Sequence, residues 1–166
     1  MMLVAGYGTF ITNAFSSLKE DLTATQWYWN VKVLGRHRLK GWKRTMPKGF
    51  RYAIIVPDEN SHVDLLVVKT EEENLRSIDH VEGYPNLYNR IEIETQWGTA
   101  HLYVPSDSFK HDFFPGYLDI SEDKWQERID MLVCPLAREL FPEFFSDSVK
   151  RNGKTNKQTQ NIKIEV

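Results

Sequence analysis

The chain has 166 residues, a length that favours one domain over two. Hydrophobic residues make up 41% of it and aromatic residues 13%, which excludes a disordered chain and predicts a core that needs neither disulfides nor a structural metal. The 21 basic and 23 acidic side chains give a net charge of −2, which argues against a dedicated nucleic-acid binder.

Cysteine content and apolar runs bear on where the protein works. Cys134 is the single cysteine and cannot form an internal disulfide, which fits a reducing compartment. No apolar run approaches the roughly 20 residues that span a bilayer. The opening apolar stretch, residues 2–5, is too short for the core of a signal peptide. We therefore expect a cytoplasmic protein that does not bind a membrane.

Apolar and alternating runs in the N-terminal half predict β-structure. In chain order the predicted strands are residues 2–5, 31–33, 36–40, 52–56 and 63–68. Gly6 and Gly8 follow the first strand and predict a tight turn, after which residues 14–22 predict a short helix. Residues 57–60, Pro-Asp-Glu-Asn, predict a turn that closes the fourth strand.

A helix is predicted to begin at Thr70. Its hydroxyl can cap the free amide groups, Glu73 can complete a capping box, and the neighbouring acids favour the positive end of the helix dipole. Leu75 and Ile78 give the helix an apolar face, and the pattern ends near Glu82.

The rest of the chain predicts a hairpin and a second helix. Residues 90–96 alternate, and residues 99–104 pair with them across a Trp-Gly turn. Ser121 caps an amphipathic helix that includes Trp125, and Pro135 kinks or ends it.

Strands predominate in this pattern, with two or three helices beside them. The class is therefore α+β, either a small mixed β-barrel or a strongly curved sheet with flanking helices. We expect one domain over residues 1–145, which includes the C-terminal amphipathic helix, and a polar tail over residues 146–166.

Two segments could carry chemistry. Gly6-x-Gly8 lacks the third glycine of a dinucleotide fingerprint and fits either a tight turn or a loop whose N–H groups hold an anion. Glu82 stands at the C-terminal end of a predicted helix, where the dipole would raise its pKa towards the range useful for proton transfer. The alternative is a solvated glutamate before a capping glycine.

The two segments contain Tyr-Gly-Thr-Phe at 7–10 and Ile-Asp-x-x-Glu-Gly at 78–83. Together they resemble the gamma-glutamyl cyclotransferase-like superfamily, in its gamma-glutamylamine cyclotransferase and avirulence-induced-gene-like branch. The first resembles the Tyr-Gly-Ser/Thr-Leu motif that opens these proteins. Ile-Asp-x-x-Glu-Gly-x-Pro-x-Leu-Tyr-x-Arg at 78–90 resembles their Leu-Asp-x-x-Glu-Gly…Tyr-x-Arg motif. Leu-x-Gly-Trp-x-Arg at 39–44 looks like the strand and turn that the family places between them.

The resemblance implies a site and a reaction. It assigns the catalytic acid/base role to Glu82, and it implies that the N–H groups of the loop 7–10 hold the α-carboxylate of a γ-glutamyl group. The substrate-binding residues that it implies are Tyr7, Gly8, Thr9, Phe10 and Tyr88. The reaction releases 5-oxoproline from a small γ-glutamyl amide, amino acid or peptide, and it needs neither metal nor cofactor.

Two positions depart from the family pattern. Phe10 stands where leucine or asparagine is usual, and Val-Asp-Leu-Leu at 63–66 lacks the Gly-Glu pair of the family's Val-x-Gly-Glu strand. These departures leave a second hypothesis open, a catalytically silent relative that binds a small carboxylate in the same pocket. The oligomeric state is open as well.

A basic stretch without acids lies between residues 22 and 57. Its basic residues are Lys32, Arg36, Arg38, Lys40, Lys43, Arg44, Lys48 and Arg51. The alternation of Arg36, Arg38 and Lys40 favours the solvated face of a strand. Attraction of an anionic small substrate and binding of nucleic acid are the alternatives.

Other titratable residues carry weaker signals. The five histidines show no metal-ligand spacing, so no metal site is predicted, and His80 is expected to be exposed. Cys134 is expected to be a core residue on the second helix.

Overall fold

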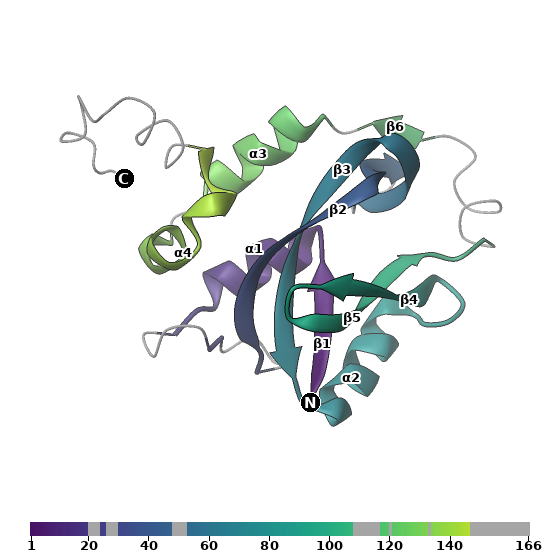
Figure 1. Cartoon of the computed structure of the whole chain (residues 1–166), viewed down its shortest axis with the longest axis horizontal. Helices are drawn as coiled ribbons and strands as arrows, with labels where there is room; N and C mark the ends of the chain where they lie inside the picture. The colour runs from purple at the N-terminus through teal and green to yellow at the C-terminus, as the bar shows by residue number, and fades with distance from the viewer. Residues whose placement is uncertain are drawn as a thin grey trace.

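The computed structural model describes residues 1–19, 24–25, 30–47, 53–107, 117–119, 121–132 and 134–146. In chain order the elements are β1 (Met2–Gly6), α1 (Thr9–Ser16), β2 (Lys32–Pro47), β3 (Ile54–Thr70), α2 (Glu72–Glu82), β4 (Tyr88–Thr95), β5 (Gly98–Pro105), β6 (Tyr117–Asp119), α3 (Glu122–Asp130), α4 (Pro135–Leu140) and the 3-10 helix η2 (Pro142–Phe144). Figure 1 shows α1, α3 and α4 gathered on one side of the sheet, with α2 apart from them.

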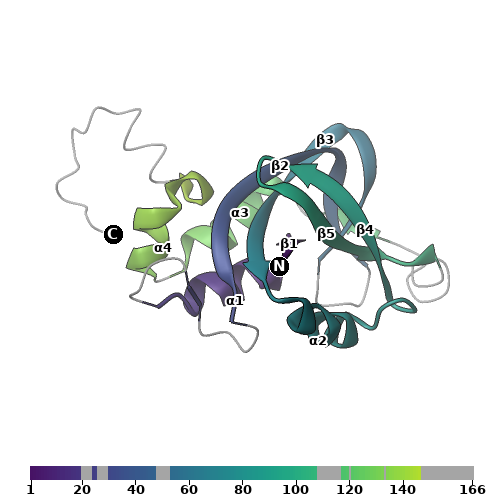
Figure 2. The ribbon, with the colours of Figure 1, turned by 60° about the horizontal axis from the view of Figure 1, so that its bottom comes forward.

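The six strands form one mixed sheet in the order β4-β5-β1-β3-β2-β6. β1 pairs in parallel with β5, and the other neighbours are antiparallel. Figure 2 shows the long β2–β3 ribbon bending strongly along its length. The predicted α+β class and curved sheet are confirmed. The alternative prediction of a small closed barrel is wrong. Closure requires the two edge strands to pair, and β4 and β6 lie at opposite edges of the described sheet.

The sheet is buried on both faces. Val4 and Ala5, which are successive residues of β1, belong to two different apolar clusters, and so do Leu66 and Leu65 of β3. Because side chains alternate along a strand, a continuous apolar run arises where both faces are covered. This explains why the runs 2–5 and 63–68 are strands although they do not alternate.

β2 joins two strands that the sequence predicted separately. The ladder with β3 continues across a register shift between Val33 and Gly35, so the intervening residue forms a bulge. A bulge reverses the alternation of side chains, which is why the pattern broke there. The predicted hairpin is confirmed as β4 and β5, with Thr95 opposite Gly98.

β3 runs through the turn predicted at residues 57–60. Its pairing with β2 holds up to Pro57 and resumes at His62, so the turn is an irregularity within one strand. The Asn60 N–H donates to the Asp58 carboxylate at 3.0 Å, which is the local bond expected of such a turn. The predicted end of the strand is wrong because β2 pairs on both sides of the irregularity.

α1 begins earlier than predicted, at Thr9 rather than at residue 14. Its N-cap is Gly8, which has no side chain to bond the free N–H groups, so the polar residue that usually marks a helix start is missing. Residues 20–22 of the predicted helix lie outside the described residues.

α2 ends as predicted but begins differently. Glu71 is its N-cap and makes no side-chain cap, so the predicted capping box is wrong. Thr70 is the last residue of β3, and its hydroxyl accepts a hydrogen bond from the Asn74 amide at 2.8 Å. Leu75 and Ile78 form the buried face, as predicted.

The predicted second helix is two helices. Ser121 caps α3 as predicted, accepting from the Lys124 N–H at 3.1 Å. α3 ends at Asp130, and Pro135 opens α4, where a proline fits because the first turn does not need its N–H. Cys134 is therefore the N-cap of α4, partly buried, and its thiol donates to the Phe15 carbonyl at 2.9 Å.

An aromatic cluster joins the C-terminal helices to α1. The Phe15 ring centroid lies 5.2 Å from that of Phe144, 5.8 Å from that of Phe145 and 5.9 Å from that of Phe141. Such pairs add to the stabilisation that burial gives. The cluster therefore fixes α1, whose N-terminus faces the pocket described below.

Two further expectations concern the chain as a whole. Over the described ranges, no helix combines the length and the apolar character that a membrane crossing requires. The predicted tail, residues 146–166, lies outside the described residues apart from Ser146.

Candidate active site

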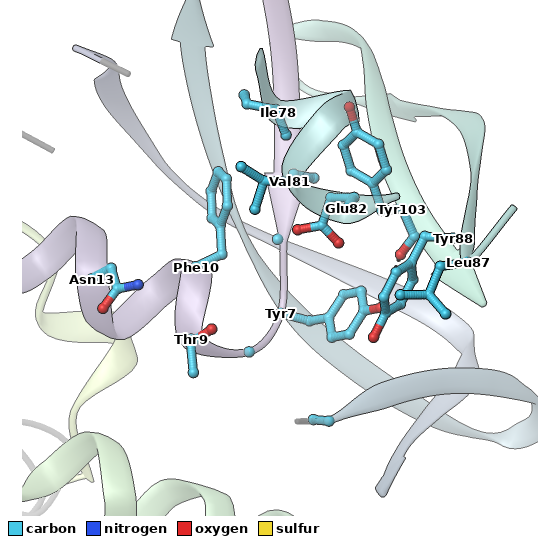
Figure 3. Close-up of a pocket in the computed structure, with 14 residues that line it drawn as sticks. Tyr7, Thr9, Phe10, Asn13, Ile78, Val81, Glu82, Leu87, Tyr88 and Tyr103 are labelled. Atoms are coloured by element: carbon cyan, nitrogen blue, oxygen red, sulfur yellow. Dashed lines mark hydrogen bonds between the residues drawn. The ribbon is translucent and has the colours of Figure 1, made fainter. Parts of the chain in front are cut away.

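A pocket of about 530 Å³ lies between the N-terminus of α1 and the C-terminus of α2 (Figure 3). All the predicted site residues line it, namely Tyr7, Gly8, Thr9, Phe10, Glu82 and Tyr88. Ile78, Val81 and Leu87 add apolar walls. Two motifs separated in the sequence by β2 and β3 therefore meet at one cavity.

Glu82 is the last residue of α2, and its position follows from how that helix ends. Gly83 adopts the left-handed conformation, with φ 68° and ψ 32°. Its N–H donates to the His80 carbonyl at 3.2 Å, and the Tyr84 N–H donates to the Asp79 carbonyl at 2.9 Å. These bonds close the helix at a glycine. The Glu82 carboxylate points into the space between Phe10 and Tyr88 (Figure 3).

The Glu82 carboxylate has the electrostatics of a proton-transfer group. Burial raises its pKa from the ordinary 4.5 to about 7. The direction is the predicted one, and its cause is desolvation of the carboxylate by burial. No hydrogen bond or ion pair to Glu82 occurs among the described residues, so its pKa is not lowered by a cationic partner.

Two tyrosines beside Glu82 stay protonated. Burial raises the pKa of Tyr7 well above its usual range, and its electrostatic interactions with Tyr88 and Glu82 raise it further. Burial followed by the charge of Glu82 raises the pKa of Tyr88 in the same way. The Tyr7 hydroxyl donates to the Tyr103 carbonyl at 2.9 Å, which fixes its ring in the wall of the pocket.

The turn from β1 into α1 is suited to an anion. No side chain caps α1, and its first turn contains no acid. In the part of the chain that the structure describes, the N–H groups of Gly8 and Thr9 make no hydrogen bond. Free N–H groups at a helix N-terminus attract negative charge. A Cβ on Gly6 would lie 2.3 Å from Cγ of Phe10, so only glycine at position 6 lets this ring pack against β1.

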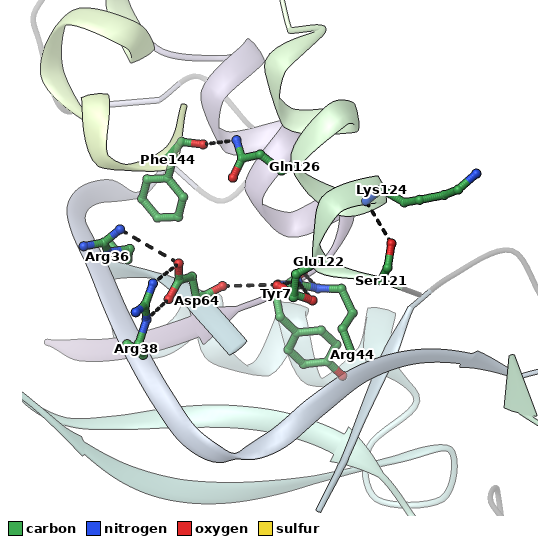
Figure 4. A network of polar contacts seen from close by, with 10 residues as sticks. All are labelled: Tyr7, Arg36, Arg38, Arg44, Asp64, Ser121, Glu122, Lys124, Gln126 and Phe144. Atoms are coloured by element: carbon green, nitrogen blue, oxygen red, sulfur yellow. Dashed lines mark hydrogen bonds and ion pairs between the residues drawn. The ribbon is translucent and has the colours of Figure 1, made fainter. Parts of the chain in front are cut away.

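Sequence reasoning missed the role of Arg44. Its side chain is fully buried, and its Nε donates to the Tyr7 carbonyl at 3.1 Å (Figure 4). The predicted solvated face holds for Arg38, whose side chain is 48% exposed, and for Lys40. The prediction of a solvated face is wrong for Arg44. The strand is irregular at Gly41, where φ is 89°, so the alternation of Arg38 and Lys40 does not continue to Arg44. Gly41 was the local signal of this irregularity.

A second missed group ties the end of α2 to the β4–β5 hairpin. Asp79 accepts a hydrogen bond from Arg90 Nη1 at 2.6 Å and another from the Tyr103 hydroxyl. The Arg90 guanidinium also lies 4.5 Å from the Tyr84 ring centroid. Because Asp79 stands one turn before Glu82, these contacts hold the helix end that presents the carboxylate.

The missing Gly-Glu pair falls outside the pocket. Val63, Leu65 and Leu66 are fully buried in the core, and Leu66 faces Gly6 across the β1–β3 ladder. Asp64 accepts from Arg38 Nε at 2.8 Å. None of the four residues 63–66 lines the cavity.

The described residues contain no group of three or more His, Cys, Asp or Glu side chains placed to hold a metal ion. His80 is exposed, as predicted.

The fold and the pocket define a class of protein, an α+β fold with one unpaired carboxylate facing a helix N-terminus across a cavity. The family model described as "Gamma-glutamyl cyclotransferase, AIG2-like" matches residues 4–127. The chain belongs to this family, which confirms the resemblance seen in its motifs. No curated protein matches the sequence significantly.

Solved structures share the fold. An uncharacterized protein from Homo sapiens has a TM-score of 0.55 at 19% identity, with 91% of this chain and 86% of that chain covered. The protein ytfP from Escherichia coli has a TM-score of 0.53 at 20% identity, with 77% and 99% covered. An uncharacterized protein from Pyrococcus horikoshii has a TM-score of 0.52 at 17% identity, with 78% and 93% covered. At these identities the likeness shows the fold alone.

Proposed function

We propose that the protein is a cyclotransferase that releases 5-oxoproline from a γ-glutamyl amide, amino acid or peptide, with Glu82 as its general acid and base. The observation that carries this proposal is the Glu82 carboxylate itself. It is unpaired among the described residues and has a pKa raised to about 7. It lines the same pocket as Gly8 and Thr9, whose N–H groups at the start of α1 are free within the described part of the chain. Family membership supports the class of reaction.

Binding of the substrate would use both ends of the pocket. The N–H groups of Gly8 and Thr9 would hold the α-carboxylate, because they are free donors at the positive end of a helix. The γ-amide would then lie towards Glu82, with Tyr88 beside it. The proposed partner is thus a small γ-glutamyl compound.

The reaction needs one nucleophile, which the substrate brings. The α-amine attacks the γ-carbonyl carbon, a C–N bond forms, and a five-membered lactam closes. Intramolecular attack has a high effective molarity, so holding the substrate bent supplies much of the acceleration.

Glu82 would move the protons that this attack requires. Its carboxylate takes a proton from the attacking nitrogen, and the resulting carboxylic acid gives that proton to the leaving amine as the γ-amide C–N bond breaks. A group that acts as base and then as acid works best with a pKa near the working pH, which fits a pKa of about 7.

Nucleic acid is a poor alternative partner because basic residues of β2 are engaged within the protein. Arg38 pairs with Asp64 at 2.8 Å, and Arg44 pairs with Glu122 at 2.6 Å. Arg36 donates to the Glu143 carbonyl at 3.1 Å. Their charge is therefore partly neutralised, and phosphate contacts would have to compete with these bonds.

The test is to identify the product formed from a panel of γ-glutamyl amines, amino acids and peptides. We expect 5-oxoproline and the free amine from at least one of them. Glutamate in place of 5-oxoproline would refute the cyclisation, because it would mean hydrolysis. Binding of γ-glutamyl compounds without any product would instead support the silent carboxylate-binding relative.

A further inference from the structure

Arg44 is a buried cation that contacts the loop 7–10 and two elements beside it, β3 and α3. Its side chain is fully buried, whereas that of its ionic partner Glu122 is 45% exposed. Arg44 Nη1 lies 2.6 and 2.7 Å from the two carboxylate oxygens of Glu122. The guanidinium carbon lies 4.4 Å from the Trp125 ring centroid. A buried charge is unfavourable unless such contacts compensate it, so the site is built around this guanidinium.

The other two donors of Arg44 lie where β1 leaves the sheet. The β1–β3 ladder ends with Gly6 opposite Leu66, and its register, if continued, would place Tyr7 opposite Leu65 and Gly8 opposite Asp64. Instead the guanidinium bridges the gap, with Nε donating to the Tyr7 carbonyl at 3.1 Å and Nη2 to the Asp64 carbonyl at 3.3 Å. The fork of one arginine thus bonds both diverging strands, which a lysine ammonium, a compact point charge, would not do in the same geometry.

This bond sets the direction of the Gly8 N–H. The Tyr7–Gly8 peptide bond is trans, and in a planar trans peptide the carbonyl and the following N–H point in opposite directions. Because the Tyr7 carbonyl points at Arg44, the Gly8 N–H points away from it, and Gly8 lines the pocket. A cation bonded to the carbonyl also polarises the peptide and strengthens its N–H as a donor.

We infer that Arg44 is a positioning residue, which holds the Tyr7–Gly8 peptide so that the Gly8 N–H binds the α-carboxylate of the ligand, with Glu122 and Trp125 of α3 holding Arg44 in turn. The inference rests on the proposed function for the identity of that carboxylate. It assigns α3 a share in the site although no residue of α3 lines the pocket.

The experiment compares two ligands that differ only in the carboxylate. 5-Oxoproline carries it and 2-pyrrolidinone does not, so the ratio of their dissociation constants reports the carboxylate contact alone. The ratio is measured by chemical-shift titration of the native protein and of Arg44→Lys, Arg44→Gln and Arg36→Gln. Arg36 is the matched control, because it is an arginine of the same strand that bonds the C-terminal helices rather than the loop.

We expect the native protein to prefer 5-oxoproline, and the preference to fall about tenfold in both Arg44 variants. The affinity for 2-pyrrolidinone should change little, and Arg36→Gln should keep the native ratio. A merely structural role would weaken both ligands alike. A native protein without preference for 5-oxoproline would overturn the inference, and so would an unchanged ratio in the Arg44 variants.

If the Arg44 variants do not fold, Glu122→Gln takes their place. Glu122 is partly exposed, so this variant removes the ion pair without burying a new polar group. We expect a smaller fall in the ratio, and an unchanged ratio would overturn the inference. The outcome is separate from the proposed function. Binding that depends on Arg44 without turnover would refute only the enzyme, and turnover with a ratio independent of Arg44 would refute only the positioning role.

Discussion

Glu82 links the stability of the protein to its proposed chemistry. Burial raises its pKa from 4.5 to about 7, so between these values the folded protein holds a proton that the unfolded chain has released. The contribution of neutral Glu82 to the stability of the folded protein is fully present below about pH 4.5 and is lost as the pH rises through about 7. At higher pH the folded protein must therefore carry a charge that its pocket disfavours.

Glu82→Gln should remove this dependence on pH. The amide is neutral throughout, so the variant should equal the native protein near pH 4.5 and exceed its free energy of unfolding at pH 8 by at most about 3 kcal/mol. Urea unfolding at both pH values measures the difference. Glu73→Gln is the control, since Glu73 is an exposed carboxylate of the same helix. A native–variant difference that is the same at both pH values would contradict the burial of Glu82.

At the residue scale the sequence predicted the residues that contact the pocket but not those that hold them. Glu82, Tyr88 and the loop 7–10 stand in two recognisable motifs. Arg44 ends the stretch 39–44, which also resembles the family, but its role could not be predicted because its partner Glu122 lies 78 residues further along the chain. No local pattern distinguishes a buried arginine from an exposed one when its partner is that distant.

At the scale of the element, the position of Glu82 depends on how the C-terminal end of α2 is capped. Gly83 ends the helix at a positive φ, and a Cβ there would lie 2.9 Å from Cβ of Leu87. Gly41 also has a positive φ, 89°, but no atom lies near the place its Cβ would take. An alanine at position 41 would therefore meet backbone strain alone, whereas one at position 83 would meet both backbone strain and a steric contact.

Gly83→Ala should destabilise the protein more than Gly41→Ala. Each alanine costs about 1 kcal/mol for its backbone conformation, and the contact with Leu87 adds to this at position 83. Thermal unfolding measures both variants. Turnover should fall more for Gly83→Ala, because that glycine adjoins Glu82 directly. Equal losses of stability and activity in the two variants would contradict this account of the helix end.

At the element scale, propensity failed where pairing with another strand overrode it. Residues 57–60 do contain a turn, as the Asn60–Asp58 bond shows, yet β2 pairs on both sides and makes β3 continuous. Thr70 has the chemistry of a helix cap, but pairing with Met2 keeps it in β3. The start of α1 was missed for the opposite reason, because Gly8 offers no capping side chain.

At the scale of the whole molecule, α4, η2 and the residues beside them complete the hydrophobic core. Phe15 of α1 packs against Phe141, Phe144 and Phe145, so the last described turns complete the core. Asp130 then accepts from the N–H of Ser146 at 3.0 Å. The core contacts therefore reach to the boundary predicted for the polar tail.

Deletion of residues 147–166 should leave the melting temperature unchanged within about 2 °C, since it removes none of these contacts. Deletion of residues 141–166 is the matched comparison. It removes three aromatic side chains from the core, each worth about 3 to 5 kcal/mol, and should leave the protein unfolded. A large loss of stability in the shorter deletion would show that the tail takes part in the fold.

The most direct test of the central claim is the rate of 5-oxoproline release at pH 7 by native protein, Glu82→Gln and Glu73→Gln, with the best γ-glutamyl substrate of the panel. We expect Glu82→Gln to lose about 10²- to 10⁴-fold in rate, because the amide can neither accept nor return the proton, while Glu73→Gln keeps the native rate. A Glu82→Gln variant that releases 5-oxoproline as fast as the native protein would contradict the account.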